Sequence, residues 1–349
     1  MFVTRGGRIT EGASGLATIY DVARRAQVSA ATVSRVLNGR QTVDPLLAER
    51  VLDAVAELGY RRNAVARNLR KRQTSLWTVI ISDVQNPFFT SLVRGVEDVA
   101  SAAGYSVALC NSDENAEKES NYIAVALAEQ AAGLIISPSS RHIEDLNLLA
   151  ETGCPVVMVD RDLKGVHGDS VLVDNEHGAE MATSHLIDQG YERIACITGP
   201  RRLSTATQRL RGYRKALRAV GRPVDEALVR VSNFREHGGY KAMASLLDEG
   251  AKPDAVFTAN NLMTVGAMEC LAERGLSIPG DVAVVGFDEL PWADLVRPSI
   301  TTVAQPTYEE GRTAAELLAK RIARPDRKLT RITLRTELRV RASSTRVRQ

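Results

Sequence analysis

Small and polar residues that could contact a base pair gather on one side of a short predicted helix that begins after Ser29. Opposite an apolar stripe, this side carries Ala30, Ala31, Ser34, Arg35 and Asn38. Small side chains let a helix approach a surface closely, and arginine can pair with the edge of a guanine through two hydrogen bonds. The pattern therefore favours a helix that reads the major groove of DNA, although a helical hairpin with a solvated outer face would show it too.

Helix-start residues place this helix directly after another one. Thr18 is a predicted N-cap with Asp21 at the third helical position, and Ser29 is a second N-cap with Thr32 at its third position. A proline just after an N-cap and a glycine at the end mark a third helix within residues 44–59. Three short helices in this order are typical of a small DNA-binding domain, in which the second helix enters the major groove.

The segment that follows is strongly basic. Residues 61–73 contain several lysines and arginines but no acidic residue, which is a common property of a solvated linker. Here, however, Asn63 can cap a short helix over residues 64–70, and Leu69 projects from otherwise basic surroundings. A leucine presented in this way could insert between base pairs in the minor groove.

The first part of the chain, from Ala17 to Thr74, resembles the DNA-binding domain and hinge of the LacI/GalR (lactose-repressor) family of bacterial transcription regulators. The stretches that carry the resemblance are TIYDVARRAQVSAATVSRVLNG, AELGY and NAVARNL. The family usually has proline before the hinge asparagine, whereas this chain has Arg62. The resemblance implies that Ala30, Ala31 and Arg35 read bases and that Leu69 intercalates at the centre of a palindromic operator. The implied DNA-binding residues are Thr18, Ser29, Ala30, Ala31, Thr32, Ser34, Arg35, Asn38, Asn63, Arg67 and Leu69.

Composition agrees with a globular protein of two or three domains that binds nucleic acid at one end. The chain has 349 residues, of which 44% are hydrophobic and 25% charged. Residues 17–73 hold 11 lysines and arginines against 5 acidic residues, and the rest of the chain is mildly acidic.

Residues 1–16 lack the apolar core of a signal peptide and are expected to be a disordered arm of a cytoplasmic protein. The cysteines, at positions 110, 154, 196 and 270, show no C-x-x-C spacing, so we expect buried reduced thiols.

After Leu76 the sequence alternates between short β-branched runs and amphipathic helices. The expected strands are 78–82, 106–110, 133–136, 156–159 and 171–174 and, after a restart of the pattern, 193–197, 228–231, 255–258 and 282–286. Alternation of this kind predicts the α/β class, with two doubly wound subdomains whose parallel sheets are covered on both faces. A ligand would then bind at the carboxyl ends of the strands, in the cleft between the subdomains.

This part of the chain also resembles the LacI/GalR family, through NPFF, VDR, RLRGY, AN, VVGFDELPW and ITTVAQP. In that family the region is similar to a periplasmic sugar-binding protein that closes on a small effector. The resemblance implies three crossings between the subdomains, near residues 175, 304 and 328. The expected organisation is a headpiece (17–60), a hinge (61–74), an N-subdomain (75–174 and 305–327), a C-subdomain (175–304 and 328–343) and a disordered tail (344–349).

Seven residues are candidates for binding the effector. Aromatic rings can cover the C–H face of a sugar, and paired polar groups can bind its hydroxyls. The candidates are Phe88, Phe89, Arg161, Arg209, Phe234, Asn260 and Asp288. Each aromatic residue could instead be part of the core, and Asp288 could be half of a structural ion pair. The same donors would suit a purine or a sugar acid, so the sequence leaves the effector undetermined.

Enzyme motifs are absent from the sequence. It has no G-x-x-x-x-G-K-[ST], H-E-x-x-H or G-x-S-x-G pattern, and its five histidines lack metal-ligand spacing, so no cofactor or metal is expected. A secreted sugar-binding protein would need a signal peptide, and a sugar kinase fused to a helix-turn-helix would need a phosphate-binding loop. We therefore expect a homodimeric or tetrameric regulator, a repressor in most members of the family, that binds a palindromic operator and responds to a small effector. The sign of that response, and whether a protein co-effector exists, stay open.

Overall fold

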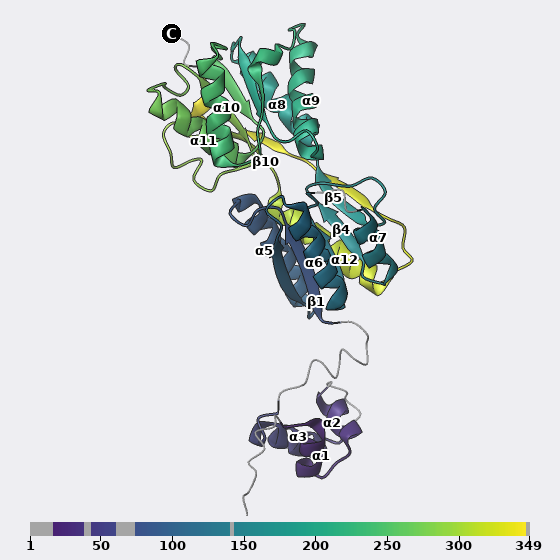
Figure 1. The fold of residues 1–349 in the computed structure, drawn as a ribbon. Helices are drawn as coiled ribbons and strands as arrows, with labels where there is room; N and C mark the ends of the chain where they lie inside the picture. The colour runs from purple at the N-terminus through teal and green to yellow at the C-terminus, as the bar shows by residue number, and fades with distance from the viewer. Residues whose placement is uncertain (1–16, 38–42, 61–73, 140–142, 347–349) are drawn as a thin grey trace, which may run out of the picture. The chain divides into compact units, whose positions relative to one another are not determined.

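The computed structural model describes residues 17–37, 43–60, 74–139 and 143–346, which belong to two compact units divided near residue 72. The first unit contains α1 (Ile19–Ala26), α2 (Ala30–Leu37) and α3 (Pro45–Glu57) (Figure 1). Thr18 and Asp21 form a reciprocal capping box, with a 2.9 Å hydrogen bond from the Thr18 N–H to Asp21, which confirms the predicted start of α1. The caps at Ser29, which accepts from the Thr32 N–H, and at Asp44, which accepts from the Leu46 N–H, are also confirmed.

The three helices share one small core. Val22, Val33 and Val51 are fully buried, each from a different helix, and Ala26 packs with them. Between α1 and α2 the chain reverses at Gln27, whose φ of 54° lies in the left-handed region. This tight turn leaves α2 with one face in the core and the other toward solvent.

The second unit, the effector unit, holds both predicted subdomains and is built on two six-stranded sheets (Figure 1). The sheet of the N-subdomain has the order β11-β5-β4-β3-β1-β2, and that of the C-subdomain has the order β12-β10-β9-β8-β6-β7. All described pairs are parallel except β10 with β12, which confirms the predicted α/β class with two parallel sheets.

The strands of the N-subdomain are β1 (Leu76–Ile81), β2 (Ser106–Asn111), β3 (Gly133–Ile136), β4 (Val156–Val159), β5 (Asp169–Val173) and β11 (Arg331–Leu334), and its helices are α5 (Pro87–Ala102), α6 (Ala116–Ala128), α7 (Ile143–Glu151) and α12 (Thr307–Ala323). The strands of the C-subdomain are β6 (Ile194–Thr198), β7 (Val229–Val231), β8 (Ala255–Thr258), β9 (Ala283–Phe287), β10 (Thr301–Ala304) and β12 (Glu337–Arg339). Its helices are α8 (Asn175–Asp188), α9 (Ser204–Ala219), α10 (Glu236–Asp248) and α11 (Asn261–Glu273).

The chain passes between the sheets three times, after β5, after β10 and after β11. The third crossing falls at residues 335–336 and not near 328, because β11 pairs with β5 at the edge of the N-subdomain sheet before the chain leaves. Ile332 and Leu334 of β11 pack against the core of that subdomain. Their apolar contacts explain why the strand stays there.

The predicted tail is also corrected at its first residue. Ser344 is fully buried in a 3₁₀ turn, and its hydroxyl lies 2.8 Å from His185 Nε2 and 2.6 Å from Thr301 Oγ1. These two polar partners hold the end of the chain against the C-subdomain. Serine and threonine at the end of a sequence give no hydrophobic pattern, so the contact was not predictable from periodicity.

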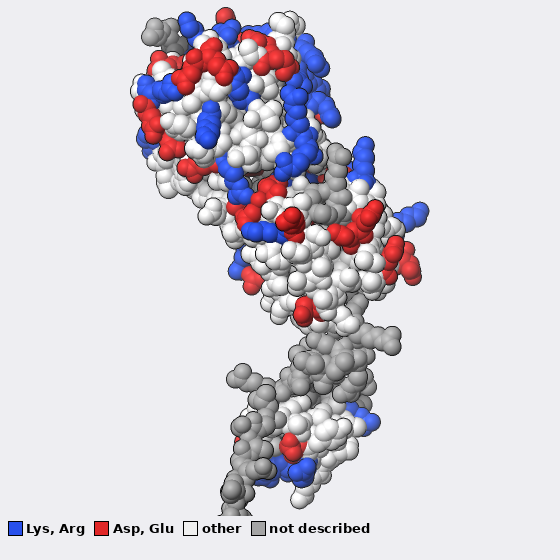
Figure 2. All heavy atoms as spheres, in the orientation of Figure 1, with Lys and Arg blue, Asp and Glu red and all other residues white. Residues whose placement is uncertain are grey.

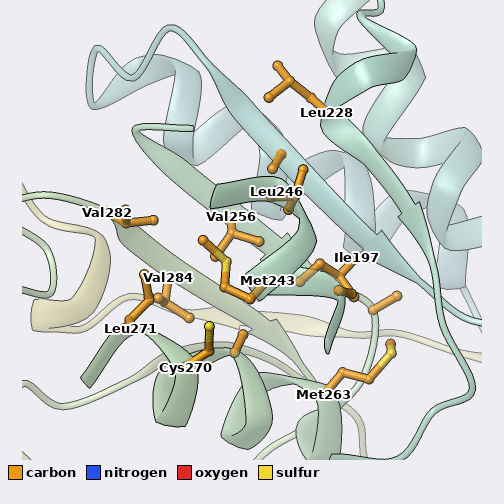
Figure 3. Packing of buried hydrophobic residues seen from close by; sticks show 14 of the residues in the cluster. Ile197, Leu228, Met243, Leu246, Val256, Met263, Cys270, Leu271, Val282 and Val284 are labelled. Atoms are coloured by element: carbon orange, nitrogen blue, oxygen red, sulfur yellow. The ribbon is translucent and has the colours of Figure 1, made fainter. Parts of the chain in front are cut away.

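Helices cover both faces of each sheet. On one face of the C-subdomain, Ile197, Val256 and Val284 of the strands interleave with residues of α10 and α11 (Figure 3).

Three of the four cysteines are buried as predicted, while Cys110 is only half-buried, and all four thiols are free. Within the described residues, no helix is long and apolar enough to cross a membrane.

Glycines allow the closest helix pairs to form. Gly95 of α5 lies against α12, and an added Cβ there would overlap the Tyr308 carbonyl oxygen. Gly212 of α9 and Gly266 of α11 make the same kind of approach to the backbones of α8 and α10. Because the atoms in the way are backbone atoms, they cannot move aside without shifting a helix.

We expect Gly95→Ala to lower the free energy of unfolding by about 1–3 kcal/mol, the usual cost of overpacking a close contact. Chemical denaturation of the effector unit would measure it. Ser101→Ala, on the exposed side of the same helix, is the control and should change stability little. An unchanged stability in Gly95→Ala would mean that α5 and α12 do not approach as closely as described.

Candidate functional site

The face of α2 predicted to read DNA is available to solvent. Ala31 and Arg35 are exposed, whereas Val33 on the opposite side is fully buried. Thr18 and Ser29 are exposed beside it, and Ala30, Thr32 and Ser34 are half-buried. The hydroxyl of Thr32 lies 2.9 Å from that of Ser29, so part of its hydrogen-bonding capacity is used in the cap. Asn38, Asn63, Arg67 and Leu69 lie outside the described residues.

Tyr20, which is not among the predicted DNA-binding residues, is 69% exposed on the first turn of α1. Leu46 and Leu52 of α3 are also exposed on this unit, so exposure alone does not make Tyr20 a contact site. On the visible face of the effector unit, acidic and basic side chains are interspersed (Figure 2).

The seven predicted effector residues all line one pocket in the effector unit. Its volume is about 420 Å³ including the open mouth, and it lies where strands of both sheets end. Each residue comes from the start of a helix or from the residues that follow a strand, except Arg209 in the body of α9. The pocket also contains residues that the sequence analysis missed, namely Asp83, Asn86, Glu114, Asp160, Thr205, Arg235 and Gln305.

The aromatic residues form an apolar wall. Phe88 and Phe89 pack edge to face with their ring centroids 4.9 Å apart, and both are nearly buried. Phe234 has a φ of 62°, which turns its ring toward the pocket from the loop before α10. Arg161 stands over that ring at 6.0 Å from the centroid. These surfaces match the C–H face of a sugar ring, although none of the three rings is free of core contacts.

Arg161 is held by acidic residues of its own subdomain. Its guanidinium donates to Glu114 Oε1 at 2.7 Å and to Ser82 Oγ at 3.2 Å, and its Nε lies 3.2 Å from Asp160. The nearby Glu114 and Asp160 carboxylates raise the pKa of Arg161 against the opposing effect of burial. The guanidinium is therefore charged and fixed in position.

Arg209 and Asp288 form a buried pair on the C-subdomain side, with 3.6 Å between Arg209 NH1 and Asp288 Oδ2. Arg209 also donates to Asn175 Oδ1 at 2.7 Å and to the Ala259 carbonyl at 2.6 Å. Asp288 accepts a short hydrogen bond from the Gln305 amide. Burial raises the pKa of Asp288, although Arg209 and Gln305 act in the other direction. The attraction between Arg209 and Asp288 therefore does not fully offset the free energy that the Asp288 carboxylate loses when it is removed from water.

Both ends of the Asn260 side-chain amide form hydrogen bonds with backbone groups. Its oxygen accepts from the Met263 N–H at 2.9 Å and so caps α11, and its amide donates to the Phe234 carbonyl at 2.9 Å. The structure therefore gives it a structural role beside any role in binding. One amide hydrogen is left that could meet a ligand.

Two buried acceptors in the pocket have no hydrogen-bond donor among the described residues, Glu114 Oε2 and Gln305 Oε1. Each would accept a hydrogen bond from a hydroxyl group of a ligand. The three arginines that line the pocket already face carboxylates, since Arg161 contacts Glu114 and Asp160, Arg209 contacts Asp288, and Arg235 contacts Asp83. Arg161 Nε is likewise buried without a hydrogen-bond partner, and Arg202 lies 4.0 Å from Glu114 Oε2, so the pocket offers both acceptors and a donor to a polar ligand.

Comparison with known proteins accounts for both units. A family model described as bacterial regulatory proteins of the lacI family matches residues 18–63, and one described as periplasmic binding proteins and sugar binding domain of LacI family matches residues 74–341. The chain belongs to the LacI family. It is a DNA-binding transcription regulator with an effector domain of the sugar-binding type, and its relatives are repressors, not enzymes.

Three relatives of this LacI-family chain illustrate the match. The ribose operon repressor of Escherichia coli strain K12 is 36% identical over 332 residues, which cover 94% of this chain and all of that protein. The lac repressor dimer bound to operator and the anti-inducer ONPF is 28% identical with a TM-score of 0.83, covering 95% of this chain and all of that one. A LacI family regulator from Enterococcus faecium with bound ribose is 30% identical with a TM-score of 0.72, covering 78% of this chain and all of that one.

Below the pocket, this LacI-family protein buries a carboxyl group that the sequence analysis did not identify. Glu310, on the first turn of α12, is completely buried, and its Oε1 accepts from the Asp160 N–H at 2.7 Å. Its Oε2 has no hydrogen-bond partner among the described residues. Burial, and then the negative charge of Asp160, raise the pKa of Glu310 well above its ordinary value.

This raised pKa makes stability depend on pH. Between the ordinary pKa and the raised one, the folded protein holds a proton that the unfolded chain does not, so the contribution to stability falls as pH rises. We expect Glu310→Gln, which keeps the acceptor for Asp160, to remove this contribution and to be more stable than the wild type near pH 8. The difference in unfolding free energy should change by at most about 1.4 kcal/mol per pH unit within that window.

Urea denaturation between pH 5 and pH 8 would measure the effect. Glu309→Gln is the matched control, because an adjacent Arg312 lowers the pKa of that exposed carboxyl, so its contribution has the opposite sign. A wild type and a Glu310→Gln variant with parallel pH profiles would contradict the assignment of a proton to Glu310.

Proposed function

We propose that the chain is a repressor that binds a palindromic operator as a homodimer in the cytoplasm, and that a neutral monosaccharide, an aldopentose such as ribose, controls its operator affinity from the cleft. The observation that carries the effector class is the pair of unsatisfied buried acceptors, Glu114 Oε2 and Gln305 Oε1, in a pocket whose arginines already face carboxylates. A polyol supplies the missing donors. A phosphate or sugar acid would add negative charge beside four carboxylates, which already face the three arginines of the pocket.

The walls of the pocket support the same class. Phe88, Phe89 and Phe234 cover its apolar side. The named relatives agree, since one represses the ribose operon and one was solved with ribose bound. A purine would use the aromatic wall but would leave Glu114 and Gln305 with fewer donors than a polyol.

The pocket is connected to the segments that join the subdomains. Arg209 donates to Asn175, at the first crossing, and Asp288 accepts from Gln305, at the second. An effector that binds Arg209 and Asp288 therefore changes contacts of two crossings at once. Suppose that the effector binds one arrangement of the two subdomains more tightly than another by about 1–3 kcal/mol. That difference in binding free energy would be enough to control operator binding.

Calorimetric titration of the full-length protein would test the effector class. We expect ribose to bind, and ribose 5-phosphate, ribonate and adenine to bind far more weakly. Tight binding of ribose 5-phosphate or of adenine, with no heat from ribose, would show that the pocket does not select a neutral polyol.

In the cleft, we expect Asp288→Asn to weaken ribose binding by about ten- to a hundredfold, because hydrogen bonds to charged groups are worth roughly 1.5–3 kcal/mol. Operator affinity without ribose should stay near that of the wild type. The substitution leaves the buried Arg209 guanidinium without its carboxylate, so we expect the free energy of unfolding to fall as well. Asp248→Asn, which breaks an exposed ion pair with Arg274, is the control. A large drop in melting temperature together with loss of both activities would assign Asp288 a structural role instead.

In the DNA-binding domain, we expect Arg35→Ala to cost about 1–3 kcal/mol on the specific operator, as for a good bidentate contact with a base. Binding to random DNA should change much less. Arg24→Ala, which removes a charge from α1, controls for the loss of charge alone. Fluorescence anisotropy with both DNAs would measure the affinities. Equal losses on operator and random DNA would place Arg35 on a phosphate.

A further inference from the structure

A buried acid that is not part of the pocket lining contacts a residue that is. Glu310 is completely buried on the first turn of α12, and its Oε1 accepts from the Asp160 N–H at 2.7 Å. Asp160 lines the pocket and has a φ of 60° at the end of β4. Glu310 Oε2 has no hydrogen-bond partner among the described residues. A change in the charge of Glu310 is therefore passed directly to the effector site.

The charged groups that face Glu310 come from three other elements. Asp160 follows β4, Asp288 follows β9, and Arg209 lies in α9, and all three are buried and line the pocket. Burial, and then the Asp160 and Asp288 carboxylates, raise the pKa of Glu310, while the bond from the Asp160 N–H and the charge of Arg209 act in the other direction. Both arginines nearby are already paired, Arg209 with Asp288 and Arg161 with Asp160.

Other charges on the packed helices are occupied at the surface. On α12 itself Glu309 pairs with Arg312, and on the neighbouring α5 Arg94 pairs with Asp98. These four side chains are exposed, so water screens them. Among the described residues, no histidine lines the pocket, so it holds no side chain that ordinarily titrates between about pH 5 and pH 8. The carboxylates of the pocket therefore dominate the electrostatic environment of Glu310.

We propose that Glu310 is a positioning residue that links effector binding to the uptake of a proton, and that it acts through Asp160. An effector that enters the pocket displaces water, and with less water the repulsion between the Asp160 carboxylate and an ionised Glu310 is stronger. The complex therefore favours protonated Glu310 more than the free protein does. Effector affinity then falls as pH rises. This link goes beyond the proposed function and rests on it only through ribose as the probe.

The linkage determines the shape of the pH dependence. Below the pKa of Glu310 in the free protein, both states hold the proton and the affinity is constant. Between that pKa and the higher pKa in the complex, the affinity falls by up to about tenfold per pH unit, and above both it is constant again. If the two pKa values differ by about 0.5–1, the total loss of affinity is about threefold to tenfold.

Calorimetric titration of the full-length protein with ribose between pH 5 and pH 9 would measure this loss. We expect it in the wild type, whereas Glu310→Gln, which keeps an acceptor for the Asp160 N–H but has no titratable proton, should show an almost flat profile. Glu309→Gln removes the same charge from the neighbouring exposed residue and is the control, which should follow the wild type.

The same titrations in phosphate and in Tris buffer require no variant. Because the two buffers release protons with different heats, the difference between the measured heats gives the number of protons taken up on binding. The wild type should take up a fraction of a proton where its affinity falls most steeply. Parallel pH profiles of the wild type and Glu310→Gln, or binding of ribose without proton uptake, would overturn the proposal.

A measurement without effector separates failure of the proton link from failure of ribose as the ligand. The amide signal of Asp160, in protein that contains ¹⁵N-labelled aspartate, reports the charge of its acceptor and is identified by its loss in Asp160→Asn. In the wild type we expect the amide proton resonance to move downfield between pH 5 and pH 9, because an ionised acceptor forms the stronger hydrogen bond. In Glu310→Gln it should not titrate.

An Asp160 signal that does not titrate in the wild type, or that titrates equally in both proteins, would contradict the role of Glu310. If ribose gives no heat at any pH, ribose is not the effector. The titration of the Asp160 signal then decides by itself whether Glu310 carries the proton.

Discussion

The buried position of Arg209 constrains both the pocket and the path of the chain between its two sheets. Its guanidinium donates to Asn175 at the first crossing and faces Asp288, which is itself tied to Gln305 at the second crossing. Burial lowers the pKa of Arg209 and raises that of Asp288, so each charge is held at some cost in free energy. The arrangement persists because the guanidinium also has the Ala259 carbonyl and the face of Phe287 as partners. A ligand that joins this group necessarily changes the environment of both crossings.

The backbone at the strand ends decides which side chains enter the pocket. Asp160 and Asp288 directly follow β4 and β9, and both have φ in the left-handed region, at 60° and 73°. Such a conformation is costly for a residue other than glycine, so other contacts must hold it. The Asp160 N–H is bound by Glu310, and the Asp288 N–H by the Val303 carbonyl. Carboxylates can therefore turn into the cleft at the first residue beyond each strand.

Much of this was predictable from sequence, because the informative signals are local. Caps at Thr18, Ser29 and Asp44 mark the helices, and apolar runs mark the parallel strands. The seven effector candidates followed from short stretches beside those elements. Signals that depend on distant partners were missed. In the sequence, Glu310 is one more acidic residue on an amphipathic helix, Gln305 is a loop residue, and β11 is a polar run. Each acquires its role only from contacts with residues far away in sequence.

The close helix pairs determine which parts of the effector unit can move. Gly95, Gly212 and Gly266 bring helix backbones together in both subdomains, so neither subdomain can deform without moving a whole helix. Relative movement of the two subdomains would therefore change the crossings and the contacts across the cleft. Polar contacts among them are Asp83 with Arg235, Asn86 with Asn261 and Glu114 with Arg202. The hydrogen bonds of a single small ligand are of similar strength, so they can favour one arrangement of the subdomains over another.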